Sequence, residues 1–391
     1  MTAAQQKIAA GVNRQRLIDT AVKLIAIPSR TGEAGPVSDC LADLLKTEGF
    51  AVERSAAGHD AAPAVVVRWS TGKPGRTLQF NGHLDTVHLP FIPPAVDGDR
   101  LTGSGSSDMK AGTAAAIEAL RVLRETGAMT GGSILLTAHD LHETPWGDGS
   151  QLDRLINDGC VGDAVLIPEY LNDRLSVIGR GGMTWKAVIG RPGAPIHEVY
   201  RPNEPSVIAA GARLVQRLEA MGKEVSQRSD PMAGSESVFI GQIHSGEIFN
   251  QYPQECRIEG TRRWLPGTSR ADVEQQLRAL FDEVARETGT SISCQIKMMR
   301  DAFVLDQKDP LVPAFQQAFR ATAGQDLRIG AKPFCDDGNS FWALRKVPAI
   351  THGPQAGGAH TLNEWVSIDD LVRVANVYAL TAVAYCNPNA A

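Results

Sequence analysis

Apolar residues recur at helical spacing near the start of the chain. The stretch 14–27 carries them three and four positions apart and ends at Pro28, and the stretch 37–48 repeats the pattern, so we expect two amphipathic helices. Short apolar runs predict strands at 64–67, 77–80, 134–136 and 164–167, with a helix at 112–125 between two of them. Strands that alternate with helices favour an α/β fold with a mainly parallel sheet flanked by helices.

The pattern changes near Gly179 to Gly182. Between 184 and 297 it predicts strand, helix, strand, strand, helix, strand, with helices at 205–221 and 269–287 and Ser269 as an N-cap. Such a unit of about 115 residues suits a small α+β sandwich inserted into a larger domain. A strand at 347–351 and a helix at 367–386 then return to the α/β pattern. The predicted domains are a larger one in two parts, 1–180 and 298–391, and an insert, 181–297.

Composition narrows the class of protein. At 391 residues, with 43% hydrophobic and 21% charged residues and a net charge of -5, the chain has the balance of a soluble globular protein of two units. It has no basic stripe, so we expect no nucleic-acid partner. No apolar run approaches the roughly 20 residues of a membrane span, and Met1 to Val12 lacks the pattern of a secretion signal. Six scattered cysteines indicate thiols in a reducing compartment, and we expect a cytoplasmic protein.

Five side chains of the types that bind divalent metals follow strand-like runs or lie in Gly-rich loops: His83, Asp108, Glu143, Glu169 and His360. Imidazole and carboxylate ligands suit borderline-soft dications, and a bridging carboxylate lets two ions lie a few ångströms apart. One such residue alone is usually a surface or capping residue, so the hypothesis needs all of them at one edge of the sheet. We expect Asp85 to hydrogen-bond the second imidazole nitrogen of His83. The pattern predicts a hydrolytic metalloenzyme.

The surrounding motifs are Gly82-His83-Leu84-Asp85-Thr86-Val87, the run from Gly103 through Asp108 to Gly112, Glu143, the strand-end Glu169, and Gly353 to His360. They resemble those of the acetylornithine deacetylase and succinyl-diaminopimelate desuccinylase family, which has aminoacylases and glutamate carboxypeptidases as relatives and in which an acidic pair ends at the position of Glu143. The resemblance covers nearly the whole chain. It implies a zinc-exopeptidase-like domain with an inserted ferredoxin-like lid that forms a homodimer.

The resemblance also implies two metal ions, usually zinc, with manganese or cobalt as other choices. It assigns His83, Asp108 and Glu169 to one ion, and Asp108, Glu143 and His360 to the other.

The chain departs from the family at the general base. The family motif is Glu-Glu, whereas this chain has His142-Glu143. Three interpretations stay open: His142 is the base, His142 is an additional metal ligand, or the reaction has been lost. We favour the base, because imidazole, with an unperturbed pKa of about 6.5, can accept a proton from metal-bound water.

Three residues of the insert match substrate-contacting positions of the family. His197 matches the lid histidine that polarises the scissile carbonyl, often across a dimer interface. Asn250 and Arg263 match positions that hold a substrate carboxylate. From the residues alone, Arg263 could equally form a surface ion pair and Asn250 could be a turn residue.

Four further positions have two interpretations each. Gly358 could offer its N–H to a carboxylate or serve only as a turn. Trp146 could line the pocket for an apolar or aromatic group or anchor a loop. Asp336 and Asp337 lie near a position where relatives carry one acid, and the sequence does not choose between them.

These features lead to one main expectation about function. We expect metal-dependent hydrolysis of an amide C–N bond in a small carboxylate-bearing substrate, either an N-acyl amino acid or a short peptide, with metal-bound water as nucleophile. One alternative is hydrolysis of an atypical C–N bond, such as that of an aromatic amine or anilide. The other is a catalytically silent relative that binds a small acid, although unused ligands would be mutually repelling carboxylates.

Overall fold

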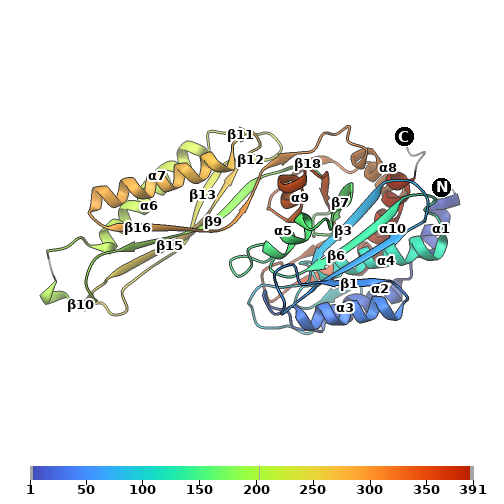
Figure 1. Ribbon diagram of the computed structural model, residues 1–391, viewed down its shortest axis with the longest axis horizontal. Helices are drawn as coiled ribbons and strands as arrows, with labels where there is room; N and C mark the ends of the chain where they lie inside the picture. Colours follow the sequence, from blue (N-terminus) through green and yellow to red (C-terminus); the bar gives the residue numbers. More distant parts are fainter. Residues whose placement is uncertain (1–2, 202, 388–391) are drawn as a thin grey trace. The chain divides into compact units, whose positions relative to one another are not determined.

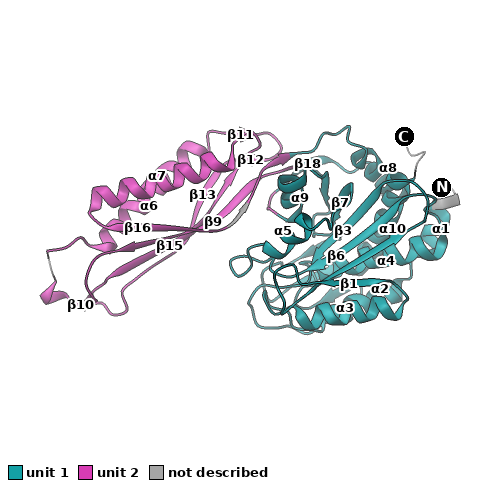
Figure 2. Ribbon diagram, viewed as in Figure 1, with its two compact units in different colours: residues 1–177, 304–332, 336–391 teal, residues 178–303, 333–335 magenta. Residues whose placement is uncertain are grey.

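The structure is a computed structural model that describes residues 3–201 and 203–387; the first two residues of the segment Met1 to Val12 lie outside this range. The chain forms two compact units, coloured separately in Figure 2. Unit 1 comprises 1–177, 304–332 and 336–391, and unit 2 comprises 178–303 and 333–335. The return of 333–335 to unit 2 has no signal in the periodicity of the sequence.

A six-stranded mixed sheet forms the centre of unit 1 (Figure 1). Its order is β1 (Val52–Ser55), β2 (Ala64–Ser70), β6 (Ser133–His139), β3 (Thr77–His83), β7 (Ala164–Ile167) and β19 (Ala349–Thr351). β6, β3, β7 and β19 pair in parallel, whereas β1, β2 and β6 pair antiparallel. The parallel strands are buried along almost their whole length, as expected of a sheet covered on both faces.

Helices pack on this sheet in groups. α1 (Ala3–Gly11), α2 (Arg14–Ile25), α4 (Lys110–Thr126), α8 (Leu311–Ala323) and α10 (Ile368–Cys386) contact one another, and α4 and α10 also contact β3. α5 (Ser150–Asn157) contacts α9 (Asp337–Arg345), which contacts β7 and β19, and α3 (Gly35–Thr47) contacts β1 and β2. The helices at 14–25 and 35–47 correspond to the two amphipathic helices expected from the sequence.

Two small sheets complete this part of the chain. One has the order β20 (Ala356–Gly357), β21 (Trp365–Ser367), β5 (Arg100–Thr102), β4 (Ala95–Asp97). The other, β17 (Phe303–Val304), β8 (Leu175–Gly179), β18 (Ile329–Lys332), includes the two strands in which the chain passes from one unit to the other.

Strands β3 and β6 run further than their apolar cores predict. Polar residues continue both strands because they bond to one another inside the sheet: Gln79 Nε2 donates to Thr137 Oγ1 (2.8 Å), which donates to Asn81 Oδ1 (2.7 Å). The extension makes His83 and His139 register partners at the ends of neighbouring parallel strands.

Unit 2 is an antiparallel sheet with two helices on it. The sheet order is β13 (Ser237–Ser245), β15 (Glu255–Trp264), β9 (Gly181–Gly190), β16 (Ser291–Arg300), and α6 (Val207–Val225) and α7 (Arg270–Thr288) pack against it and each other. Ser269 is the N-cap of α7 and accepts from Asp272 N–H, as predicted. Two ribbons extend this unit, β10 (Ile196–His197) with β14 (Gln251–Tyr252) and β11 (Ser229–Asp230) with β12 (Gly234–Ser235), and a short 3-10 helix spans Glu198–Tyr200.

Two simple features of the whole chain accompany the fold. Among the described residues, every helix is too short or too polar to be a membrane-spanning segment. The six cysteines, all within the described ranges, form no disulfide with one another.

Candidate metal centre

The ends of the parallel strands create the site. β3 ends at His83, and β7 ends two residues before Glu169. The close approach of the segments around Glu169 requires glycine, because a Cβ on Gly112 would collide with the Pro168 carbonyl and one on Gly353 with the Glu169 carbonyl.

Asp108 lies just before α4, in a loop that a buried acid holds in place. The Glu364 carboxylate accepts backbone N–H groups of Gly105, Ser107 and Asp108, at 3.1 to 3.2 Å. The sequence analysis assigned no role to Glu364.

The five candidate ligands lie together. His83 Nε2 is 3.1 Å from Asp108 Oδ1 and 3.5 Å from Glu169 Oε1. His360 Nε2 is 3.1 Å from Glu143 Oε2 and 3.4 Å from Asp108 Oδ2. Asp108 therefore directs one oxygen toward each histidine, the arrangement that a carboxylate shared by two ions needs.

The electrostatics of this cluster suit a cation. Burial, and then the charge of Asp108, raises the pKa of Glu169 to about 8 and also raises that of Glu143. Hydrogen bonds to Asp108 and Glu143 raise the pKa of His360 to about 11. Glu169 Oε2 is buried without a hydrogen-bond partner among the described residues. Three carboxylates with two imidazoles thus fit zinc, manganese or cobalt.

Asp85 differs from its expected role. The Nδ1 atom of His83 is 3.0 Å from the backbone oxygen of Asp85, and the carboxylate is further away, at 3.6 Å. The carboxylate instead accepts the backbone N–H groups of His142 (3.1 Å) and Glu143 (3.0 Å). Asp85 thus orients the imidazole through its main chain and the 142–143 segment through its side chain.

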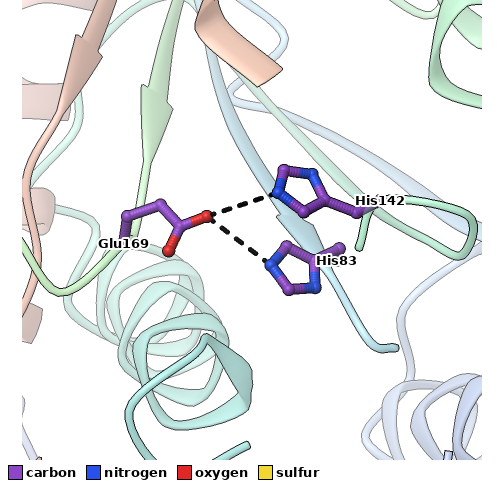
Figure 3. Close-up of side chains that lie close together, drawn as sticks. All are labelled: His83, His142 and Glu169. Carbon is purple, nitrogen blue, oxygen red and sulfur yellow. Dashed lines mark ion pairs between the residues drawn. The ribbon is translucent and has the colours of Figure 1, made fainter. Parts of the chain in front are cut away.

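His142 lies directly beside the candidate ligands (Figure 3). Its ring is parallel to that of His83, with centroids 4.0 Å apart and an interplanar angle of 4°. Its Nδ1 is 2.8 Å from Asp337 Oδ1, and its Nε2 is 3.9 Å from Glu169 Oε1. By distance alone, His83, His142 and Glu169 could hold an ion.

The structure distinguishes the two adjacent acids. Asp336 caps α9, pairs with Lys332 and accepts from Thr351. Asp337 faces the site and contacts both His142 and His139. Sequence reasoning missed His139, although its place at the end of a strand next to His83 is a signal of the same kind.

Trp146 and Gly358, whose roles the sequence left open, lie in unit 1. Trp146 is 45% exposed and stacks on His88, with centroids 4.3 Å apart. Gly358 has a φ of +75°, and a Cβ there would collide with the Asn363 carbonyl, so this glycine is needed for the turn.

The three candidate substrate contacts of the insert lie in unit 2. His197 Nε2 is 3.2 Å from Asn250 Nδ2; His197 is exposed and Asn250 is half-buried. Arg263 lies near the other end of β15, where its Nη1 is 3.4 Å from Cys335 Sγ. The ten residues of β15 correspond to about 30 Å of strand, so unit 2 brings His197 to Asn250 but not to Arg263.

Comparisons with known proteins give consistent results. The model of a family described as Peptidase family M20/M25/M40 matches residues 79–384. A succinyl-diaminopimelate desuccinylase of Cereibacter sphaeroides is 26% identical over 375 residues, 91% of this chain and 95% of that protein. The crystal structure of human carnosine dipeptidase 1 has a TM-score of 0.79 at 14% identity, covering 98% of both chains. A dinuclear metal-binding peptidase of Bacillus subtilis has a TM-score of 0.65 at 16% identity, covering 95% and 97%.

Proposed function

We propose that this chain, which belongs to peptidase family M20/M25/M40, uses two bound metal ions to hydrolyse the amide bond of a small carboxylate-bearing substrate. Membership makes the chain a metal-binding hydrolase; the substrate and the metal are the proposal. An N-acyl amino acid or a short peptide agrees with relatives and structural neighbours named desuccinylase and dipeptidase.

The observation that carries the proposal is the position of Asp108 between His83 and His360, with one oxygen toward each. His83, Asp108 and Glu169 would hold one ion, and Asp108, Glu143 and His360 the other; zinc is our first choice. The chemistry supplied by bound ions there is Lewis acidity toward the substrate carbonyl and toward the attacking water.

We assign the general base to His142. A nitrogen lone pair lies in the plane of its ring, and the rings of His83 and His142 are parallel, with centroids 4.0 Å apart. Their lone pairs therefore lie in separate planes, which favours the base over a second imidazole ligand beside His83. Nε2 of His142 can instead accept the proton of the attacking water and pass it to the leaving amine.

We assign recognition of the substrate to unit 2. His197 would stabilise the oxyanion, and Arg263 and Asn250 would hold the substrate carboxylate. His197 pairs with Gln251, just before β15 begins, whereas Arg263 is near the end of β15. One copy of unit 2 therefore cannot present both side chains to one small molecule. We therefore propose a homodimer in which His197 and Asn250 act in the site of the second copy.

An exposed sheet edge supports this dimer. β13 is an outer strand of its sheet and exposes 63% of Phe239 and 52% of Ile243. An uncovered outer strand with large apolar side chains favours pairing with another chain.

A second candidate function is hydrolysis next to an aromatic group, such as an aryl amide. It is favoured by Trp146, which is 45% exposed although it stacks on His88. Trp146 is three residues after Glu143, so their Cα atoms are at most about 11 Å apart. An exposed indole this close to the metal centre can stack on a planar substrate group.

One assay separates these possibilities. N-acyl amino acids, dipeptides and aryl amides are tested with zinc, manganese and cobalt, alongside elemental analysis of the purified protein. Chelator-sensitive hydrolysis of N-acyl amino acids or dipeptides supports the main proposal. A preference for aryl amides that Trp146→Ala removes supports the second. The absence of both bound metal and hydrolysis would favour the silent relative.

A further inference from the structure

Asp337 accepts hydrogen bonds on both of its carboxylate oxygens. It is completely buried. Its Oδ1 is 2.8 Å from His142 Nδ1, and its Oδ2 is 2.8 Å from both His139 Nε2 and Asn81 Nδ2. Two histidines of the 139–143 segment therefore share a single carboxylate that comes from α9.

The direction of these hydrogen bonds is fixed from inside the sheet. Gln79 Nε2 donates to Thr137 Oγ1, so the single hydroxyl hydrogen of Thr137 is directed to Asn81 Oδ1. The amide of Asn81 must then present its NH₂ group to Asp337. The chain of hydrogen bonds from Gln79 through Thr137 and Asn81 therefore ends on an accepting oxygen of Asp337. Burial raises the pKa of Asp337, but its interactions with His142 and His139 outweigh burial and hold that pKa well below its usual range.

An ionised carboxylate can only accept hydrogen bonds. The His142 nitrogen that faces Asp337 must therefore carry a hydrogen, so whenever the ring is neutral its lone pair is on Nε2. His142 Nε2 points toward Glu169 and lies 3.9 Å from its Oε1. The free lone pair of the ring therefore points toward the candidate metal ligands.

We propose that Asp337 is the positioning residue of this site: it fixes the tautomer and the ring plane of His142 so that Nε2 can accept a proton. This inference rests on the proposed function. Asp337 would supply, from behind the imidazole, the carboxylate that the related Glu-Glu motif carries at position 142. The replacement of that glutamate by histidine then keeps a base in the site.

The substitution Asp337→Asn tests the tautomer directly. The NH₂ group of Asn81 can only donate to the Oδ2 position, whereas His142 faces Oδ1. An asparagine would therefore turn its oxygen toward Asn81 and its NH₂ toward His142. The imidazole would then have to accept at Nδ1 and carry its hydrogen on Nε2, where it cannot act as a base.

The first measurement is NMR of the zinc-loaded protein labelled with ¹⁵N in its histidines, with the His142 signals identified from their loss in His142→Gln. We expect a hydrogen on Nδ1 in the wild type and on Nε2 in Asp337→Asn. Asp336→Asn, the same change on the neighbouring acid that pairs with Lys332, should leave the tautomer as in the wild type. A wild-type hydrogen on Nε2, or no change in Asp337→Asn, would overturn the proposal.

The second measurement is kinetic. Asp337→Asn should lower kcat by about 10² or more, with KM and metal content within a few-fold of the wild type. In a His142→Glu background the same change should have almost no effect on kcat, because no imidazole remains to be oriented. An equal loss in both backgrounds would show a merely structural role. If the wild type hydrolyses nothing, the proposed function fails, while the NMR result still decides the role of Asp337.

Discussion

The imidazole rings of His83 and His142 lie parallel, with centroids 4.0 Å apart and planes inclined by 4°. Residue type alone leaves open whether His142 is a ligand or a base. The lone pairs of two parallel rings lie in separate planes, which supports our proposal that His142 acts as a base beside the groups that would hold the metal.

The first prediction concerns the base. His142→Ala should lower kcat by roughly 10² or more, because proton transfer by a positioned side chain contributes about that much. Metal content, measured by elemental analysis, should stay at the wild-type value. Loss of metal in this variant would make His142 a ligand, and unchanged kcat would remove it from the mechanism.

The second prediction concerns the shared ligand. Asp108→Ala should lose both ions, whereas Glu169→Ala and His360→Ala should each lose one, because Asp108 directs one oxygen toward each histidine. Stoichiometry after dialysis against dilute zinc is the measurement. Asp158→Asn, which alters an exposed ion pair with Arg154, is the control and should keep the wild-type stoichiometry. Equal losses in all three ligand variants would contradict a bridging role for Asp108.

The third prediction concerns His352 and pH. This ring is buried against Phe315, and neither nitrogen has a hydrogen-bond partner in the described chain. Burial, and then the charge of Arg373, holds its pKa well below the usual value of 6.5. The unfolded chain therefore binds this proton first, so the contribution to stability is complete above about pH 6.5 and is lost as the pH falls below it.

Urea unfolding of wild type and His352→Leu at pH 7, 6 and 5 measures that contribution. The difference in free energy of unfolding should shift in favour of the variant by up to about 1.4 kcal/mol per pH unit below pH 6.5. Parallel pH profiles of the two proteins would show that His352 takes its proton in the folded state as readily as in the unfolded one.

The fourth prediction concerns the second copy. His197→Ala and His142→Ala should each have strongly reduced activity alone. After the two are mixed and allowed to exchange subunits, about a quarter of wild-type activity should return, because half of the symmetric dimers are hybrids with one complete site each. No recovery, despite hybrids detected by mass spectrometry, would place His197 in the site of its own chain.

Much of the fold was predictable because it depends on local patterns. The family and the α/β class are confirmed, and the expected ligands lie at strand ends and in Gly-rich loops, where the sequence had marked them. Strand limits were less predictable. Asn81 and Thr137 look like the ends of strands in the sequence, yet they continue the strands by bonding to each other, and Thr137 to Gln79, inside the sheet.

The surroundings of His142 could not be predicted for a related reason. Its partner Asp337 is 195 residues away in the sequence, and both Asp336 and Asp337 are buried acids at the start of the same helix. Which of the two faces the site depends on how α9 packs against β7 and β19, and no local sequence pattern determines that packing. The use of the Asp85 main chain, in place of its side chain, as the partner of His83 is hidden in the same way.

The most direct test of the account is anomalous diffraction at the zinc absorption edge from crystals of the zinc-loaded protein. We predict two peaks, one on each side of the Asp108 carboxylate, with His83 and Glu169 at one, Glu143 and His360 at the other, and His142 Nε2 bonded to neither. A single peak, a peak bonded to His142, or no peak near Asp108 would contradict the account.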